Sequence, residues 1–222
     1  VFEEKTMTME DLLAACEADF ENYDEIYDRV YNETPKYGND DDYADTLLRD
    51  VAASLQDVIA GRPTPKGSKT VVEFLPTTCH VYFGQVMEAS PNGRHKGIPL
   101  PDGISPEKGA DRNGPTAVIK SASKIDQTKT GGALLNQKFT PSVVAGEAGI
   151  TNMASLVRSY FALDGHHIQF NVIDRETLLK AQKHPKEYEN LIVRVAGYSD
   201  YFNNLEKALQ DEIISRTEQA FG

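Results

Sequence analysis

Apolar residues near the N-terminus recur at helical spacing. Thr8 and Asp11 resemble a helix-capping pair, in which each side chain bonds to the backbone of the other residue. The apolar residues that follow this pair are Leu12, Leu13, Cys16 and Phe20. Their spacing predicts a first helix that begins after Thr8.

A longer apolar stripe follows, again at helical spacing. It consists of Tyr43, Leu47, Leu48, Val51, Leu55, Val58 and Ile59. The stripe stops before Gly61, a residue type that often ends helices, and Pro63 and Pro65 come soon after it. The pattern predicts an amphipathic helix that packs through one apolar face.

Residues 71–87 show a different pattern. They form β-rich runs, interrupted by the segment LPTT, and therefore predict strands. The turn PNGR, at Pro91–Arg94, then opens a stretch rich in glycine and proline that extends to Pro115. This stretch is the best candidate for a domain boundary. We expect one domain over residues 1–93 and another over residues 101–222.

Helix and strand patterns alternate after that boundary. Thr151 predicts the start of a helix whose apolar face holds Met153, Leu156, Val157, Tyr160 and Phe161. The segment HIQFNVI indicates a buried strand, and Asp174 indicates the cap of a short helix that ends before Pro185. A strand-like run, LIVRVA, leads into Gly197, and a last apolar stripe predicts a terminal helix: Leu205, Leu209 and Ile213. The alternation predicts an α/β fold.

Composition narrows the functions that this chain can have. Its 222 residues hold 23 Lys+Arg against 34 Asp+Glu, and the net charge of -11 argues against a nucleic-acid surface. No apolar run approaches the ~20 residues that span a bilayer, and no secretory signal is visible. Cys16 and Cys79 lie too far apart in sequence for a disulfide framework or metal spacing. We expect a cytoplasmic protein that binds neither nucleic acid nor membranes.

Three features invite a metal or phosphate interpretation, and each has a simpler explanation. The acidic run at residues 40–42 complements the N-terminal dipole of the predicted helix and lacks the ligand spacing of an EF-hand. His166 and His167 are adjacent, so on a strand they point to opposite faces. Gly131 and Gly132 have no Walker pattern around them. We therefore expect no metal site and no bound cofactor.

The segment RVAGYSDYF, Arg194–Phe202, resembles the radical-bearing loop of the glycyl radical enzymes. Other motifs stand in the order seen in that family: GALLNQKF, LVRSYF, HIQFNVID and DEIISRTEQ. The resemblance implies that Gly197 loses an α-hydrogen and stores the radical between turnovers, in a loop whose burial protects it from oxygen. Glycine suits this chemistry because its α-carbon has no Cβ and can flatten without steric conflict. Taken alone, Gly197 would be interpreted as a turn glycine.

The resemblance also implies the fold. The chain would be the C-terminal part of a ten-stranded α/β barrel of the pyruvate formate-lyase-like type, with the glycine radical domain at residues 101–222. The family passes the radical to a cysteine in a Cys-x-Glu loop, and neither Cys16 nor Cys79 has a glutamate two residues later. We interpret both as small buried apolar residues. Because the chain opens at Val1 and the family's polypeptides are several times longer, we expect a C-terminal fragment that is inactive alone.

Three upstream segments resemble the trans-4-hydroxy-L-proline dehydratases within the family: TPKYGNDDDYAD, LPTTCHVYFG and GISPEKG. The resemblance implies dehydration of trans-4-hydroxy-L-proline to pyrroline-5-carboxylate through a glycyl and then a thiyl radical. It also places Thr77 at a hydroxyl position that contacts the substrate, with Thr78 beside it, although threonines in strands are equally often there for packing. Two alternatives stay open: a glycerol or diol dehydratase or another carbon–heteroatom lyase of the family, and a non-catalytic spare-part subunit that carries the radical.

The partners follow from the same resemblance. A radical S-adenosylmethionine activase with an iron–sulfur cluster would install the radical on Gly197 after the loop swings out. The full-length enzyme would be an anaerobic homodimer that acts on a small-molecule substrate. The only cofactor would then be the protein-derived radical itself.

Overall fold

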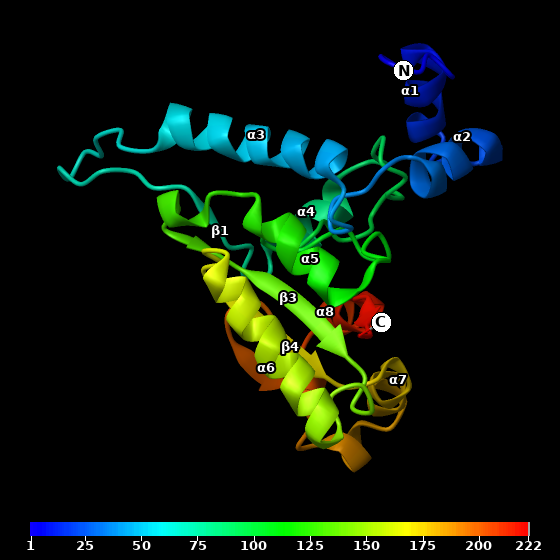
Figure 1. The fold of residues 1–222 in the computed structure, drawn as a ribbon. Coiled ribbons are helices and arrows are strands. Elements are labelled where there is room, and N and C mark those ends of the chain that lie inside the picture. The colour runs from blue at the N-terminus through cyan, green and yellow to red at the C-terminus, as the bar shows by residue number, and fades with distance from the viewer. Residues whose placement is uncertain (222) are drawn as a thin grey trace. The chain divides into compact units, whose positions relative to one another are not determined.

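The computed structural model describes residues 1–221, and its contacts divide the chain into two compact units (Figure 1). The first unit joins Val1–Pro35 to Cys79–Leu100. The second joins Lys36–Thr78 to the chain from Pro101 onward. Each unit is discontinuous in sequence, whereas the predicted domains of residues 1–93 and 101–222 are continuous, so that division stays a prediction.

The first unit begins with α1, Met9–Glu17, and confirms the predicted first helix. Its cap is reciprocal, because the Asp11 amide donates to the Thr8 hydroxyl at 3.0 Å and the Thr8 amide donates to the Asp11 carboxylate at 3.1 Å. The helix ends before Phe20, which is buried with a positive φ of 63°. The rest of the unit holds α2, Asp24–Asp28, a π-helical turn at Arg29–Glu33, and α4, Cys79–Val86.

The α4 helix shows that the prediction of strands over residues 71–87 was wrong beyond Phe74. Gly84 explains the difference, since a Cβ there would lie 2.4 Å from the Ile98 carbonyl oxygen. This close approach of helix and chain is a tertiary contact, and such contacts override local β-propensity. The interpretation of Cys79 as buried was also wrong, because it is exposed in the first turn of α4, while Cys16 is buried as expected.

The second unit is built on parallel strands. A three-stranded sheet has the order β4-β3-β7, formed by β3 (Leu135–Phe139), β4 (Ile168–Val172) and β7 (Glu218–Gln219). Both pairings in it are parallel. A second parallel pair joins β1, Glu73–Phe74, to β2, Gly132–Ala133, whereas β5, Ile192–Arg194, and β6, Ser199–Tyr201, form an antiparallel hairpin. Parallel strands with intervening helices confirm the predicted α/β class.

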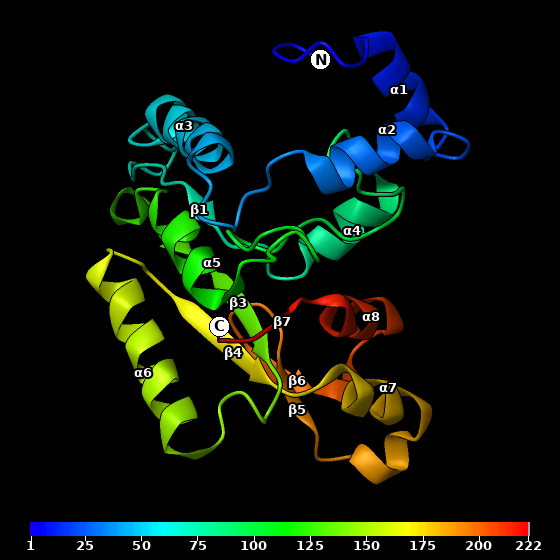
Figure 2. The same ribbon diagram turned by 45° about the vertical axis from the view of Figure 1, so that its right-hand side comes forward.

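Two helices cover the central sheet (Figure 2). They are α5, Gly114–Ser123, and α6, Gly146–Ala162, and their shared core with β3 contains Val118, Ile119, Ala122, Leu135, Phe139, Leu156 and Tyr160. The prediction that Thr151 starts α6 was wrong, because the helix begins earlier, at Gly146. Gly149 permits this start, since a Cβ there would lie 2.5 Å from the Val144 carbonyl carbon.

The remaining helices follow the strands in sequence. Helix α7, Arg175–Lys183, begins at the predicted cap, where the Asp174 carboxylate accepts a hydrogen bond from the Thr177 amide at 2.6 Å. Helix α8, Lys207–Ser215, is the predicted terminal helix. Short 3-10 turns occur at Gln127–Lys129, Pro185–Tyr188 and Phe202–Asn204.

Helix α3, Asp42–Ile59, confirms the predicted long helix but buries a different side of it. Its buried residues are Asp45, Ala52 and Gln56, whereas most of the predicted apolar stripe is exposed: Tyr43, Leu47, Val51, Leu55, Val58 and Ile59. Asp45 is held there by Lys124, at 2.7 Å, and by the Ser121 hydroxyl, at 2.8 Å. Polar contacts therefore decide which side faces the unit.

The acidic run of residues 40–42 is used for helix capping and ion pairing. The Asp41 carboxylate caps α3 by accepting from the Tyr43 amide at 2.9 Å. Lys124 lies 2.8 Å from Asp42 and 3.3 Å from Asp40. Within residues 1–221, no group of three or more histidine, cysteine or acidic side chains could hold a metal ion.

The Gly197 turn as candidate functional site

Gly197 lies at the tip of the β5–β6 hairpin, in a tight turn. The Val195 amide closes this turn by donating to the Tyr198 carbonyl oxygen at 2.8 Å. Gly197 has a φ of +85°, in the left-handed region that glycine adopts without strain. A Cβ added to it would meet only the Leu134 side chain, at 3.7 Å. Backbone conformation, rather than lack of space, therefore favours glycine here.

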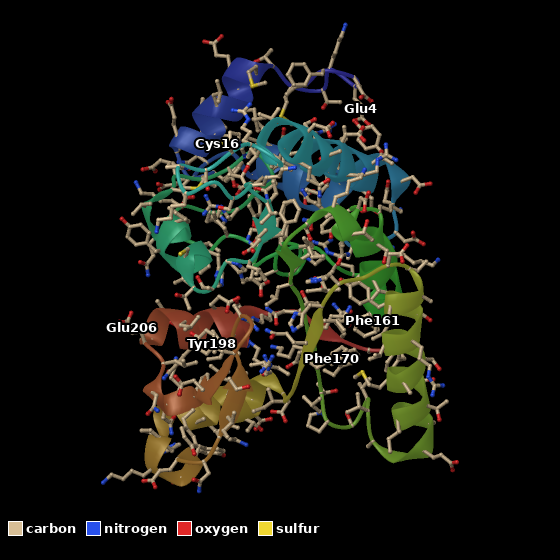
Figure 3. The ribbon with its side chains drawn as sticks, turned by 90° about the vertical axis from the view of Figure 1, so that its left-hand side faces the viewer. Glu4, Cys16, Phe161, Phe170, Tyr198 and Glu206 are labelled. Atoms are coloured by element: carbon tan, nitrogen blue, oxygen red, sulfur yellow. The ribbon has the colours of Figure 1, made fainter. Side chains whose placement is uncertain are left out.

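The turn is buried on one side only. Val195 and Ala196 are buried, whereas Gly197 is exposed in this chain, so the expectation of a buried loop is not met within these residues. Tyr198, labelled in Figure 3, follows it and is 40% exposed. An α-hydrogen at Gly197 is thus reachable from the surface of this unit.

A single side chain from β4 contacts the turn at two points. Gln169 accepts a hydrogen bond from the Gly197 amide at 3.2 Å and donates one to the Val195 carbonyl oxygen at 3.3 Å. Gln169 itself is only 4% exposed. Its amide therefore brackets Ala196 and holds the backbone on both sides of it.

The Val195 carbonyl oxygen has two further side-chain donors. Asn136, on β3, donates to it at 3.4 Å, and the Arg216 guanidinium donates at 2.9 Å. The preceding Arg194 carbonyl oxygen accepts from Asn171, on β4, at 2.8 Å and from Arg216 at 3.2 Å. Residues from β3, β4 and the end of α8 thus converge on one edge of the hairpin.

Arg216 is a buried cation with two acidic partners. It lies 2.9 Å from Glu212, one turn earlier in α8, and 3.8 Å from Asp102. Burial works to lower its pKa, but Glu212 and Asp102 outweigh burial and raise the pKa above its usual value. The guanidinium therefore stays charged beneath the turn, where it can stabilise the negative end of the Val195 carbonyl dipole.

A polar pocket lies alongside Arg216. Its lining includes Asp102, Ser105, Lys108, Asp111, Asn136, Lys138 and Gln219. Burial raises the pKa of Asp111 to about 6, although Thr217 and Gln219 donate hydrogen bonds to it. Burial lowers the pKa of Lys138 to about 8, and its ammonium donates to the Ile214 carbonyl oxygen at 3.0 Å.

Thr77 and Thr78 lie in the loop that follows β1. Thr77 is exposed, has a φ of +50° and donates its hydroxyl to the Pro76 carbonyl oxygen at 2.6 Å. A left-handed φ is a genuine outlier for a β-branched residue. The connection from β1 to the turn runs through Leu134, whose amide donates to the Phe74 carbonyl oxygen at 3.2 Å and whose side chain lies nearest to Gly197. The two threonines are thus linked to the turn through the strand before them.

Sequence reasoning missed Gln169, Asn136, Asn171 and Arg216. A signal for three of them was present, because Asn136, Gln169 and Asn171 are polar residues within the strand-like segments GALLNQKF and HIQFNVID, and all three are buried. Buried polar groups require hydrogen-bond partners, so such residues indicate a network. Nothing in the sequence indicated that the partner of this network is the Gly197 turn, since the contacts span more than twenty residues.

Comparisons with known proteins show what this chain is similar to. The family model described as Glycine radical matches residues 100–203, and the one described as Pyruvate formate lyase-like matches residues 1–84. The chain is 61% identical over 221 residues to a trans-4-hydroxy-L-proline dehydratase of Clostridioides difficile, covering 100% of this chain and 28% of that protein. It is 44% identical to an isethionate sulfite-lyase of Bilophila wadsworthia, over 98% of this chain and 26% of that protein.

Solved structures of two dehydratases match the fold of this chain. Hydroxyproline dehydratase from Clostridioides difficile, with trans-4-hydroxy-L-proline bound, matches with a TM-score of 0.97 at 61% identity over 100% of this chain and 28% of that one. The B12-independent glycerol dehydratase from Clostridium butyricum matches with a TM-score of 0.95 at 44% identity, with the same coverage. The chain thus spans little more than a quarter of the length of these relatives, and it has the fold of the corresponding part of the pyruvate formate lyase-like barrel.

Within the described residues, no helix is both long and apolar enough to cross a membrane.

Proposed function

This chain belongs to the glycyl radical enzymes, and we propose that it is the radical-storing portion of a dehydratase whose radical resides on Gly197. The observation that carries the proposal is the position of Gly197. It lies inside the segment matched by the Glycine radical model, at the exposed tip of a hairpin, with its neighbouring peptide groups held by buried side chains.

The geometry suits loss of an α-hydrogen atom. Homolysis of the Cα–H bond gives the hydrogen atom to the attacking radical and leaves a planar carbon flanked by an amide nitrogen and a carbonyl. Both groups delocalise the unpaired electron, and glycine has no Cβ to oppose the flattening. We propose that a radical S-adenosylmethionine activase supplies the attacking radical, and that the exposed side of Gly197 is the side it reaches.

For the complete polypeptide we propose the conversion of trans-4-hydroxy-L-proline to pyrroline-5-carboxylate and water. A thiyl radical, from a cysteine outside this chain, would take hydrogen from the carbon next to the ring nitrogen and return it after water leaves. The reaction is redox-neutral overall. The 61% identity to a trans-4-hydroxy-L-proline dehydratase, which extends over the whole chain, supports this substrate over the diols.

Thr77 and Thr78 are the residues of this chain that we propose for substrate contact. Strained backbone conformations of the kind seen at Thr77 gather at binding and catalytic sites, where the surroundings maintain them. A threonine hydroxyl can donate to a carboxylate or accept from an ammonium group, and proline-type substrates carry both.

The proposal also covers the domain bounds, the compartment and the oligomeric state. We propose a barrel portion over residues 1–93, a glycine radical domain over residues 101–222, and a cytoplasmic homodimer as the complete enzyme. The 44% identity to an isethionate sulfite-lyase and to a glycerol dehydratase keeps another carbon–heteroatom lyase as the second candidate function.

Isotope labelling and a substrate panel test the proposal. The complete polypeptide, activated without oxygen, should show a doublet in its electron paramagnetic resonance spectrum, and the doublet should collapse when the protein contains α-deuterated glycine. It should dehydrate trans-4-hydroxy-L-proline in preference to glycerol and isethionate. Turnover of glycerol or isethionate alone would assign the second candidate, and a radical without any turnover would indicate a spare-part subunit.

A further inference from the structure

One primary amide controls the orientation of two peptide groups in the Gly197 turn. The Gln169 oxygen accepts from the Gly197 amide at 3.2 Å, and its nitrogen donates to the Val195 carbonyl at 3.3 Å. These two contacts have opposite polarity. Gln169 can therefore make both only when its side-chain amide faces the turn in one of its two possible orientations.

The orientation of Gln169 is set by Asn136. The two residues are directly paired in the parallel register of β3 and β4, and the Gln169 nitrogen donates to the Asn136 side-chain oxygen. This bond leaves the Gln169 oxygen to face Gly197. The Asn136 and Gln169 side chains belong to residues that are 9% and 4% exposed, so water cannot readily substitute for either partner.

The orientation of Asn136 is set in turn by Asp102. An ionised carboxylate can only accept hydrogen bonds, so Asn136 must present its nitrogen to Asp102 and its oxygen to Gln169. The Arg216 guanidinium lies 3.8 Å from the same carboxylate. The series Asp102, Asn136, Gln169 is thus a chain of hydrogen bonds with one direction, and it ends at the amide of Gly197.

Gln169 matters more to the Gly197 amide than to the Val195 carbonyl oxygen. Val195 keeps two other donors, Asn136 and Arg216. Within residues 1–221, the Gly197 amide donates to Gln169 alone. That amide forms the peptide plane directly before the α-carbon, which must align with the following carbonyl for an unpaired electron to spread over both groups.

We infer that Gln169 is a positioning residue for the Gly197 α-carbon, and that the polarity of the Asp102–Asn136–Gln169 chain decides whether it can act. The role of this alignment in storing a radical rests on the proposed function. The hydrogen-bond chain itself does not, and the two parts are measured separately.

Hydrogen exchange tests the contact in the complete polypeptide before activation. Gln169→Met keeps the length of the side chain and removes its bonds to Gly197, Val195 and Asn136. The Gly197 amide loses one of these bonds and should exchange about two- to tenfold faster, the range for one lost hydrogen bond. Gln137→Met is the matched control, because Gln137 is a neighbouring β3 residue with the same 4% exposure and donates to Pro115 instead. Equal exchange at Gly197 in both variants would overturn the inference.

A polarity reversal provides a second test. Gln169→Glu alone places a carboxylate oxygen opposite the Asn136 oxygen, so the bond between these two residues is lost. Asp102→Asn alone removes the fixed direction but leaves an amide oxygen that can still accept from the Asn136 nitrogen. In the double variant the new amide at position 102 can donate to the Asn136 oxygen, and the Asn136 nitrogen can donate to the new carboxylate at position 169. That carboxylate can still accept from the Gly197 amide, and the restored bond to Asn136 holds it in place, so this amide should exchange more slowly in the double variant than in Gln169→Glu alone. If the increases in the exchange rate of the Gly197 amide simply add in the double variant, the hydrogen bonds from Asp102 to Gln169 have no direction to reverse.

Radical spectroscopy tests the functional part. After anaerobic activation, Gln169→Met should alter the hyperfine coupling of the exchangeable Gly197 amide proton and shorten the lifetime of the radical, whereas Gln137→Met should change neither. Unaltered coupling and lifetime in Gln169→Met would overturn the positioning role. If the unsubstituted polypeptide forms no radical on Gly197, the proposed function fails, and the exchange measurements still decide whether Gln169 orders the turn.

Discussion

Arg216 and Glu212 form a buried ion pair one helical turn apart, with 2.9 Å between the guanidinium and the carboxylate. Glu212 is 1% exposed and Arg216 is 7% exposed. The same guanidinium that bonds to Glu212 also donates to the Val195 carbonyl oxygen at 2.9 Å. Helix α8 therefore fixes the hairpin edge through a charge that Glu212 keeps in place.

Removing the charge of Glu212 should destabilise the fold. Glu212→Gln keeps the shape but leaves Arg216 buried with Asp102 as its remaining carboxylate partner among residues 1–221, and breaking a buried pair costs about 3 kcal/mol. Denaturant unfolding of the complete polypeptide measures this loss. The control is Lys207→Gln, which removes an exposed pair with Asp211 in the same helix and should change stability little. Equal effects of the two variants would contradict the importance of burial.

Gly197→Ala should abolish the radical while costing little stability. The space around an added Cβ is open except for Leu134 at 3.7 Å, so the cost is the left-handed φ, about 1 kcal/mol. Backbone strain, rather than crowding by the methyl group, is therefore what the substitution introduces. Gly61→Ala is the control, because Gly61 has a φ of +77° and nothing within 4 Å of its Cβ. It should lose similar stability and keep the radical.

Exposure to air tests the Gly197 radical through cleavage of the backbone, which mass spectrometry detects. A radical on the Gly197 α-carbon should react with oxygen and cut the backbone there. The released tail should begin at Tyr198. Intact mass spectrometry of activated polypeptide before and after air checks this, with Gly197→Ala as the uncut reference. An activated sample that stays whole would place the radical elsewhere.

Thr77→Ala should reduce kcat/KM for trans-4-hydroxy-L-proline by up to about tenfold, the effect of one lost hydrogen bond. Thr77→Ser retains the hydroxyl and should preserve most of the activity, which separates hydrogen bonding from packing. Thr78→Ala measures the neighbouring position in the same assay. Unchanged kinetics in Thr77→Ala would remove that residue from the substrate site.

Stability should fall as the pH rises from about 4 to about 6, because of Asp111. Its folded pKa is raised to about 6 from 3.8, so within that window the folded state binds more protons than the unfolded state. The difference of about 2 pH units corresponds to roughly 3 kcal/mol. Asp111→Asn should flatten this part of the curve in unfolding measurements across the pH range. Parallel curves for the two proteins would show that Asp111 does not titrate as described.

Local features were predictable from the sequence. The Thr8 cap, the Asp174 cap and the end of α3 near Gly61 all depend on residues within four positions of one another. Gly197 was proposed as the radical site from the motif around it, and that assignment stays a prediction. In each of these cases the residues that decide the feature lie close together in the sequence, so the local sequence pattern reveals it.

Features decided by distant contacts were not predictable. Helix α4 forms where β-rich residues stand because Gly84 packs against Ile98, and α3 turns Asp45 inward because Lys124 and Ser121 bind it there. The support of the Gly197 turn by Gln169 is of the same kind. A buried polar residue in a strand indicates that a partner exists, but the fold alone decides which residue that is.

The β5–β6 hairpin is a sheet of its own, separate from the β4-β3-β7 sheet. Three residue pairs hold it together, and its bonds to β3 and β4 near the tip come from side chains. Displacing the tip therefore breaks no strand pairing of the larger sheet, and such sub-global openings cost less than unfolding. Side-chain bonds can be strengthened or weakened by one substitution at a time. The readiness of this hairpin to open is thus a trait that evolution can adjust in small steps without redesigning the barrel.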